Sequence, residues 1–440
     1  MSNLAIGLWS FPILISLIFL RMPIGLAMLL VGLGGSVAIN GTTLMIVAQL
    51  KHLTYGTFSS YSLSIVPLFL LMGQFATLGK LSAALFKAAE AFLGHRRGGV
   101  AMAAVGACAG FGSICGSSLA TAATMGQVAL PELKKYGYSN ALATGTLAAG
   151  GTLGILIPPS VILVIYAILT EQNIAKLFAA AMIPGLLAAL GYMLTIHVYA
   201  RLFPASAGTT ERVPWAQRII IMGSTWPVFI IFMLVVGGIY LGVFTPTEAA
   251  AVGAFGTGLV AFFNRGLHWQ SFTNALLATA SSTAMIFFIV LGAAIFNAFL
   301  ASTQLPQTLA EYVSSQGYDP WLILGLVLLL YLLLGCVMDS LSMILLTVPI
   351  FFPIMVTLDF GMSAEHFALW FGILVLIVVE VGLITPPVGL NLFVINKMAK
   401  DVPIVETFRG VTPFVFADIV RVILLVLFPG ITLWLVKLLY

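Results

Sequence analysis

Charged side chains are scarce in this sequence. Asp, Glu, Lys and Arg make up 7% of its 440 residues, whereas soluble domains carry about 25%. So few charges cannot cover a water-exposed surface, which excludes a soluble enzyme, and a chain that is 61% hydrophobic is not disordered. Long unbroken apolar runs also argue against a transmembrane barrel, whose strands are segments of about ten alternating residues. These absences leave an all-α polytopic membrane protein.

Residues that hold metals, cofactors or nucleotides are equally sparse. The three cysteines (Cys108, Cys115 and Cys336) lie in apolar stretches without CxxC spacing, so we expect buried thiols rather than disulfides or a zinc site. The histidines show no ligand spacing, and HExxH, P-loop and GxGxxG motifs are missing. We expect no catalytic residues, no cofactor and no ATP site, and the net charge of +4 gives no reason to propose nucleic acid.

Apolar runs long enough to cross a membrane recur along the chain, since about 20 residues suffice. They lie at 4–20, 23–49, 60–79, 98–131, 138–170, 177–200, 219–243, 246–263, 273–300, 320–358, 366–396 and 411–438. We expect residues 4–20 to be retained rather than cleaved as a signal peptide. The break at Arg21-Met22-Pro23 leaves open whether residues 4–49 form one span or two.

Two of these runs do not suit a simple crossing. Residues 98–131 carry no charge but have a polar, glycine-rich middle at 110–118, and residues 320–358 have a similar middle at 335–340. Each arm has about a dozen residues, too few to span. Irregular backbone at mid-membrane is tolerated only inside protein or beside a water-filled cavity. We therefore predict two re-entrant helical hairpins.

The charges that flank the hairpins predict their direction. Basic residues flank the first (Lys80, Lys87, Arg96, Arg97, Lys134 and Lys135), and acidic residues flank the second (Glu311, Asp319, Asp359 and Glu365). Basic loops face the cytoplasm, so the first hairpin enters from inside and the second from outside. Residues 80–97 suit an interfacial amphipathic helix, with a short cytoplasmic loop helix as the alternative.

The two halves of the sequence share motifs at nearly constant offset. Gly154-Ile-Leu-Ile-Pro-Pro159 matches Gly382-Leu-Ile-Thr-Pro-Pro387. The other matched pairs are Gly112 and Gly335, Pro131 and Pro353, and Pro184 and Pro413. One Pro-Pro alone would indicate only a kinked helix, whereas a matched pair behind two opposed hairpins indicates inverted repeats. Inverted repeats with discontinuous helices are typical of secondary transporters.

The repeats predict a division of the chain. We expect N-terminal scaffold helices at 1–79, the interfacial helix at 80–97, the first repeat at 98–200, scaffold spans and connectors at 201–319, and the second repeat at 320–440. The first repeat contains the hairpin 98–131 and a broken helix at 138–170. The second contains the hairpin 320–358, a broken helix at 366–396 and a final span at 411–438.

Broken helices place free carbonyls and free N–H groups at mid-membrane. Carbonyl and hydroxyl oxygens suit a hard cation such as sodium, and two repeats predict two sites. The first would use Gly112, Ser113, Gly116, Ser117, Gly151 and Gly154. The second would use Gly335, Asp339, Ser340, Gly382, Thr385 and Val388.

Helix N-termini favour a substrate that carries a carboxylate. Ser117, Ser118, Asp339 and Ser340 suit N-caps, and Pro159 and Pro387 suit the first helical position. The predicted substrate-binding residues are Ser118, Thr121, Pro159, Pro387 and Asn391. The alternative for such polar residues is a hydrogen bond to a neighbouring helix.

Four carboxylates lie within the apolar runs, at Glu248, Asp339, Glu380 and Asp418, and Glu248 is expected to be structural. A charge at the bilayer centre costs about 2.5–3.5 kcal/mol, so Asp339 is predicted to be a cation ligand or hairpin-tip cap. The alternative is a carboxyl that is protonated or bonded to backbone. Glu380 could support the same pocket or contact a partner helix, and Asp418 is expected to pair with Arg421 for structural reasons.

Several strings resemble the large membrane subunit of TRAP (tripartite ATP-independent periplasmic) transporters. They are Gly116-Ser-Ser118, the segment 145–160, Thr170-Glu171 and Thr385-Pro-Pro-Val-Gly-Leu-Asn-Leu-Phe-Val394. Their order matches over essentially the whole chain. Many members have proline after the Gly-Ser-Ser, whereas this sequence has Leu119, which departs from the family's residue pattern at the hairpin tip.

The resemblance implies an inverted-repeat ion-transporter-like fold with a scaffold and an elevator transport domain. It implies a multi-pass protein of the bacterial inner membrane that takes up an organic acid, such as a C4-dicarboxylate or sugar acid, with sodium as coupling ion. It also implies a periplasmic substrate-binding protein and a small four-helix membrane subunit as partners, besides lipid. The alternative is a stand-alone sodium/carboxylate symporter of the same fold. A channel would need repeated pore-lining charges and an intramembrane enzyme a nucleophile–base or metal pair, and the sequence shows neither.

Overall fold

The computed structural model describes residues 2–41 and 44–440, and these residues form helices and connections without a strand. Helices α1 (Asn3–Phe19) and α2 (Ile24–Asn40) are separate and pack on one another, so residues 4–40 form two helices rather than one. Helix α2 ends because Gly41 adopts the left-handed conformation of a C-cap. The predicted run 23–49 is therefore wrong as a single helix, since α3 (Leu44–Phe58) follows as another element.

The first hairpin follows a short amphipathic helix. A 3-10 turn, η1 (Tyr61–Ser64), leads into α4 (Ile65–Leu78) and then α5 (Leu81–Leu93), which buries Leu81 and Phe86 and exposes Lys87. The next two helices are α6 (Gly99–Cys115) and α7 (Ser118–Lys135), which pack together. A broken helix follows as α8 (Asn140–Leu156) and α9 (Val161–Leu169), bent by 46°. The long α10 (Ile174–Leu202) closes this unit.

The middle of the chain is less regular than its hydropathy predicts. It contains η2 (Pro204–Ser206), α11 (Trp215–Gly223), α12 (Trp226–Phe232), the π-helical η3 (Met233–Gly237), α13 (Gly238–Tyr240) and α14 (Pro246–Phe263). The predicted run 219–243 is not one straight helix, because the chain bends by 51° after α11 and widens into a π turn. Pro227, in the first turn of α12, cannot donate to a preceding helix and so favours a new start there.

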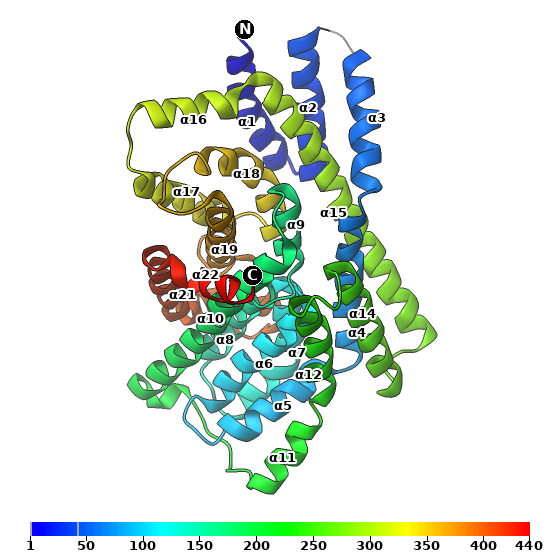
Figure 1. Cartoon of the computed structure of the whole chain (residues 1–440). Helices are drawn as coiled ribbons and strands as arrows, with labels where there is room; N and C mark the ends of the chain where they lie inside the picture. Colours follow the sequence, from blue (N-terminus) through cyan, green and yellow to red (C-terminus); the bar gives the residue numbers. More distant parts are fainter. Residues whose placement is uncertain (1, 42–43) are drawn as a thin grey trace.

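A second, smaller hydrophobic core joins the N-terminal helices to α15 (Trp269–Thr303) and α16 (Leu305–Ser315). Helix α2 packs along α15, and α4 packs along α14. Figure 1 shows α15 crossing the molecule obliquely, with α16 at the opposite end from α5. Helix α16 was missed by the sequence analysis, which placed residues 201–319 among spans and connectors without a second amphipathic helix.

The second hairpin unit repeats the element order of the first. It consists of α17 (Pro320–Gly335), α18 (Ser340–Met355), α19 (Ala364–Gly382), α20 (Leu390–Met398), α21 (Ile404–Leu427) and α22 (Pro429–Leu439). The predicted final span at 411–438 is wrong as one helix, because Pro429 begins a separate helix after the break at Phe428. Figure 1 places α17 and α18 in the upper half of the molecule and α6 and α7 in the lower half.

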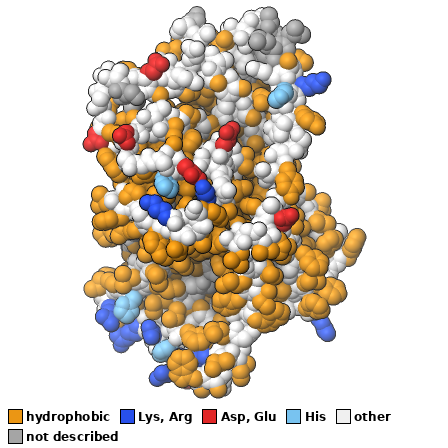
Figure 2. Space-filling model, viewed as in Figure 1, with side chains coloured by type: hydrophobic (Ala, Val, Ile, Leu, Met, Phe, Trp, Pro, Cys, Tyr) orange, Lys and Arg blue, Asp and Glu red, His pale blue; other side chains and the backbone are white. Residues whose placement is uncertain are grey.

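Apolar side chains cover much of the surface seen in Figure 2; the acidic side chains lie in its upper half, while basic side chains gather at its lower end and a few others lie in the upper half. Among the described residues, six helices are long and apolar enough to cross a membrane, or eight if each bent pair is one span. Exposed leucines, phenylalanines and tryptophans on these helices need a lipid or protein environment. The chain is therefore built as a multi-pass membrane protein.

Candidate functional site

The end of each hairpin's first arm touches the end of a broken helix, and glycines make the contact in both halves. A Cβ added to Gly112 would lie 2.6 Å from the Cα of Gly154, and one added to Gly382 would lie 2.6 Å from the Cα of Gly335. Real Cβ atoms do not approach that closely, so only glycine permits this packing. The structure thus brings together the helix ends predicted for each cation site.

The remaining glycines of the first predicted site also approach neighbouring backbone. Gly116 adopts a φ of +63°, and a Cβ there would lie 3.2 Å from the carbonyl oxygen of Pro159. A Cβ on Gly151 would lie 2.7 Å from that of Ala122 on α7. Ser113 differs, because its hydroxyl donates to the Gly110 carbonyl at 2.8 Å within its own helix.

The second predicted site has a matching connection. The N–H of Gly389 donates to the Cys336 carbonyl at 3.2 Å, which ties the α19–α20 connection to the hairpin tip. The hydroxyl of Thr385 donates to the Val381 carbonyl at 2.6 Å, and Val388 directly precedes Gly389. These residues form one cluster around the tip at 335–340.

Polar side chains cap both returning helices. Ser117 accepts from the N–H of Ala120 at the start of α7. Asp339 does the same for α18, where one carboxylate oxygen accepts from the N–H of Ser342 at 3.0 Å and the other from its hydroxyl at 2.6 Å. Asp339 is therefore the hairpin-tip cap that the sequence predicted as one of its two roles.

One carboxylate lies where the two tips meet. Glu380 on α19 is fully buried and accepts hydrogen bonds from the hydroxyls of Ser118 on α7 and Ser340 on α18, the latter at 2.7 Å. Glu380 was predicted to support the pocket of Asp339 or to contact a partner helix, and its bond to Ser340 places it beside that pocket, although it was not among the predicted ligands. The sequence marks Glu380 as unusual, because it is a charged residue within a long uncharged run. It does not predict the contact with Ser118, because the two residues are far apart in the chain.

Two predicted substrate-binding side chains carry buried atoms without a hydrogen-bond partner among the described residues. They are the hydroxyl of Thr121 and the amide oxygen of Asn391, whose nitrogen donates to the Ala148 carbonyl at 3.3 Å. Both face α8, because a Cβ on Gly154 would strike the Thr121 hydroxyl and one on Gly151 would lie 3.2 Å from the Asn391 nitrogen. Unpaired buried polar atoms are costly, which marks this place as a candidate ligand contact.

The predicted position of the prolines is wrong. Helix α9 begins at Val161 and α20 at Leu390, so neither Pro159 nor Pro387 is the first helical residue. At α9, Ser160 is the N-cap, because its hydroxyl accepts a hydrogen bond from the N–H of Leu163. A proline side chain has no acceptor for this bond. Gly389 takes the corresponding position before α20 in a left-handed conformation.

Packing and charge connect the two hairpin units to each other. Helix α9 packs on α18 of the second unit, and α20 packs on α7 of the first. Lys134 pairs with Asp401 at 2.5 Å, and Lys176 pairs with Glu365 at 2.5 Å. The guanidinium of Arg421 pairs with Asp418 at 2.8 Å, as predicted from their spacing.

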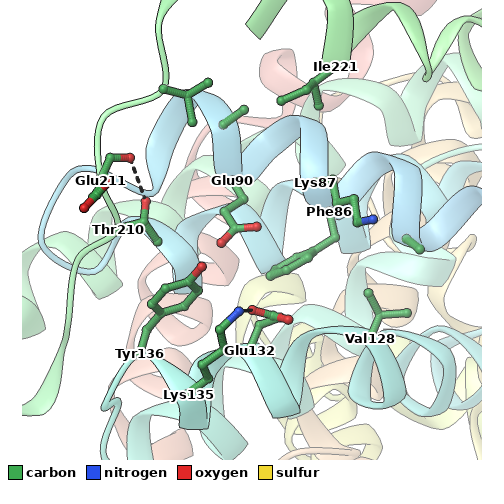
Figure 3. A pocket seen from close by; sticks show the side chains of 13 residues that line it. Phe86, Lys87, Glu90, Val128, Glu132, Lys135, Tyr136, Thr210, Glu211 and Ile221 are labelled. Atoms are coloured by element: carbon green, nitrogen blue, oxygen red, sulfur yellow. Dashed lines mark hydrogen bonds and ion pairs between the residues drawn. The ribbon is translucent and has the colours of Figure 1, made fainter. Parts of the chain in front are cut away.

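The cavities lie away from most of the predicted residues. A cavity of about 740 Å³ lies between α5, the base of α7 and the connection before α11, where Figure 3 shows Glu90, Glu132 and Lys135 around it. Burial, with the nearby Glu132 carboxylate, raises the pKa of Glu90. Another cavity of about 560 Å³ separates α1 from the second hairpin and includes Asp339 and Leu390. This second cavity reaches the predicted second cation site at Asp339.

The paired hairpins and broken helices define a polytopic helical membrane transporter. The fold is similar to the solved structure of the Alcanivorax borkumensis YdaH transporter, with a TM-score of 0.63 and 16% identity over 86% of this chain and 87% of that one. Residues 11–431 match the family described as "Tripartite ATP-independent periplasmic transporter, DctM component". The chain belongs to this family, that of the large permease subunits of TRAP transporters.

Individual relatives support the assignment along almost the whole chain. The C4-dicarboxylate TRAP transporter large permease protein DctM of Pseudomonas aeruginosa is 38% identical over 91% of this chain and 92% of its own length. The sialic acid TRAP transporter large permease protein SiaM of Vibrio cholerae is 32% identical over 96% and 97%, respectively. The chain is therefore similar to permeases named for two different acids.

Proposed function

We propose that this chain is the permease subunit of a sodium-coupled, binding-protein-dependent secondary transporter that imports an organic acid by an elevator mechanism. It would act in the bacterial inner membrane beside a small four-helix subunit and receive substrate from a periplasmic binding protein. Family membership supports the partners and the membrane. The named substrates of the relatives are a C4-dicarboxylate and sialic acid, which share a carboxylate.

The observation that carries the proposal is the repeated glycine contact. Gly112 meets Gly154 in one half, and Gly335 meets Gly382 in the other, at positions the sequence pairs. Each contact joins two helix C-termini, whose last carbonyls lack intrahelical partners. Such carbonyl clusters on discontinuous helices coordinate coupling ions in inverted-repeat transporters. This supports one sodium site in each half.

The element order supports inverted repeats with a scaffold. An amphipathic helix precedes each hairpin: α5 precedes α6, and α16 precedes α17. The packing of α4 on α14 in one half corresponds to the packing of α2 on α15 in the other. We assign residues 1–79 and 201–319 to the scaffold. The transport domain would contain 98–200 and 320–440, joined by the Lys134–Asp401 and Lys176–Glu365 pairs. Because these two ion pairs connect the two hairpin units, the proposed transport domain would move as one rigid body.

The substrate contact is assigned to the unpaired oxygens of Thr121 and Asn391. The Thr121 hydroxyl can donate to a carboxylate, whereas the unpaired Asn391 oxygen can only accept and would suit a donor group of the substrate, such as a hydroxyl. The N-termini of α7 and α18 supply positive potential for the carboxylate nearby. Ser118 belongs to the same region, although its hydroxyl already donates to Glu380. Pro159 and Pro387 would shape the connections rather than begin helices.

Reconstitution in liposomes tests the proposal. The permease and its small subunit are assayed for uptake of a radiolabelled C4-dicarboxylate and of sialic acid, each with its binding protein. We expect uptake of one acid to require both an inward sodium gradient and the binding protein. Uptake that persists in sodium-free buffer would overturn sodium coupling. Sodium-driven uptake without the binding protein would instead favour the stand-alone symporter.

A further inference from the structure

Glu380 is the one carboxylate that touches both hairpins through side-chain hydrogen bonds in the described part of the chain. Its two oxygens accept from different tips, Ser118 on one side and Ser340 on the other. Ser118 and Ser340 are 1% and 4% exposed and Glu380 is 0% exposed, so water does not compete for these bonds. A carboxylate with two acceptor oxygens can hold two donors at once.

The surroundings of Glu380 suit an anion. Ser118 is the first residue of α7 and Ser340 the first of α18, so two helix N-termini meet at the carboxylate. Helix N-termini carry partial positive charge, and hydrogen bonds to an ionised group are roughly twice as strong as neutral ones. The protein's own carboxylate thus uses part of the positive potential that the sequence analysis assigned entirely to substrate.

The first half of the chain has no equivalent of this carboxylate. By the match of Gly154 with Gly382, the counterpart of Glu380 is Thr152. Its hydroxyl donates to the Ala149 carbonyl at 2.7 Å and lies 3.0 Å from the hydroxyl of Tyr192, which donates to Asp418 at 2.7 Å. A single carboxylate on α19 therefore serves both tips, which breaks the symmetry between the halves.

We propose that Glu380 is a positioning residue that fastens the two hairpin tips together, so that cation binding in one half is transmitted to the other. The inference rests on the proposed sodium sites, since Ser340 belongs to one and Ser118 directly follows Ser117 of the other. A cation that draws in one tip moves its serine, and the shared carboxylate moves the second tip. Sodium binding is then cooperative, with a Hill coefficient approaching two for two coupled sites.

Sodium alone is a sufficient probe. The full-length chain, purified with its small subunit, is heated in increasing NaCl, with choline chloride holding ionic strength constant. Ligand binding raises the melting temperature by mass action, so the titration reports apparent affinity and steepness. We expect Glu380→Ala to lower the Hill coefficient to about one and to raise the half-saturating sodium concentration about tenfold, within the usual range of coupling between sites.

Conservative variants separate positioning from simple packing. Ser340→Thr keeps the hydroxyl and should retain cooperativity, whereas Ser340→Ala should lose it. In a Glu380→Ala background, Ser340→Ala should change the steepness no further. Thr144→Val is the matched control, because that buried hydroxyl bonds only to the backbone of its own helix.

The outcomes divide cleanly. A folded Glu380→Ala protein with wild-type steepness would overturn the inference while leaving the sodium sites intact. If wild-type protein shows no stabilisation by sodium, the proposed function fails first and the inference fails with it. If Glu380→Ala does not fold, Glu380→Gln is judged by the same steepness criterion, because the amide fills the same space but offers only one acceptor oxygen.

Discussion

Asp339 combines a charge with a structural cap, and two substitutions separate these properties. Asn at an N-cap is as favourable as Asp, so Asp339→Asn should retain stability while weakening sodium dependence. Asp339→Ala removes the acceptors used by Ser342 and should cost about 1 kcal/mol of stability as well. Thermal unfolding and sodium-dependent uptake of both variants give the comparison. Equal sodium dependence in wild type and Asp339→Asn would show that the Asp339 carboxylate is not a sodium ligand.

Gly382 shows how closely the helix ends are packed. Gly382→Ala places a methyl group 2.6 Å from backbone atoms of Gly335, which should destabilise the protein by about 1–3 kcal/mol and impair sodium-dependent uptake. Gly325→Ala is the matched control, because nothing lies within 4 Å of a Cβ there. Melting temperatures in detergent provide the measurement. A Gly382→Ala protein as stable and active as the control would contradict the contact.

Local chemistry determined how well individual residues could be predicted. The capping role of Asp339 follows from its place at a break before an apolar helix, and the glycine pairs follow from repeated motifs. The Ser118–Glu380 bond joins distant parts of the chain, so no local pattern reveals it. The sequence placed the start of α9 at Pro159, because proline suits the first helical position. The adjacent Ser160 is instead the N-cap, so the helix begins at Val161 rather than at Pro159.

At the scale of elements, the Lys134–Asp401 pair joins the base of α7 to the connection after α20. The hydrogen bond from Lys134 lowers the pKa of Asp401, so the pair stabilises the fold above the ordinary Asp pKa of about 3.9 and loses effect as the pH falls through the lowered value. Asp401→Asn should therefore lower the melting temperature slightly at pH 7, and this difference should shrink as the pH falls below the ordinary Asp pKa. Because the pair is exposed, the difference should be largest at low salt.

The control for that measurement lies in the same helix. Glu132 pairs with Lys135 within α7 and connects no other element, so Glu132→Gln should leave the association of the two hairpin units unchanged. Limited proteolysis across the 399–403 connection reports this association. Equal cleavage of Asp401→Asn and wild type at pH 7 and low salt would show that the pair does not hold the units together.

Helix boundaries were predictable where polar and glycine residues interrupt an apolar run. They were less predictable where the hydropathy of the run is uniform. The hairpins have polar, glycine-rich breaks in uncharged sequence, and the structure has turns at 116–117 and 336–339. The runs 219–243 and 411–438 look continuous in hydropathy, because a kink or a helix restart at proline changes direction without adding polarity. Helix α16 was missed although Leu305, Leu309 and Tyr312 recur at helical spacing, the same signal that identified 80–97.

At the scale of the whole molecule, the two hairpins predict opposite labelling. Arg97 and Tyr318 are exposed at the bases of the first and second hairpin, and the native cysteines are buried. In intact spheroplasts, a membrane-impermeant maleimide should label Tyr318→Cys, and it should reach Arg97→Cys only after permeabilisation. Labelling of both positions from one side would contradict the inverted arrangement and with it the pairing of sites.

The length of α15 has a consequence for the surrounding lipid. Its 35 residues extend for about 52 Å at 1.5 Å per residue, while the hydrocarbon layer is about 30 Å thick. Such a helix relieves hydrophobic mismatch by leaning or by projecting into the headgroups. Since α2 and α4 both pack on it, a change in acyl-chain length would alter their inclination together. Bilayer thickness thus becomes a determinant of how the N-terminal helices support the rest of the protein.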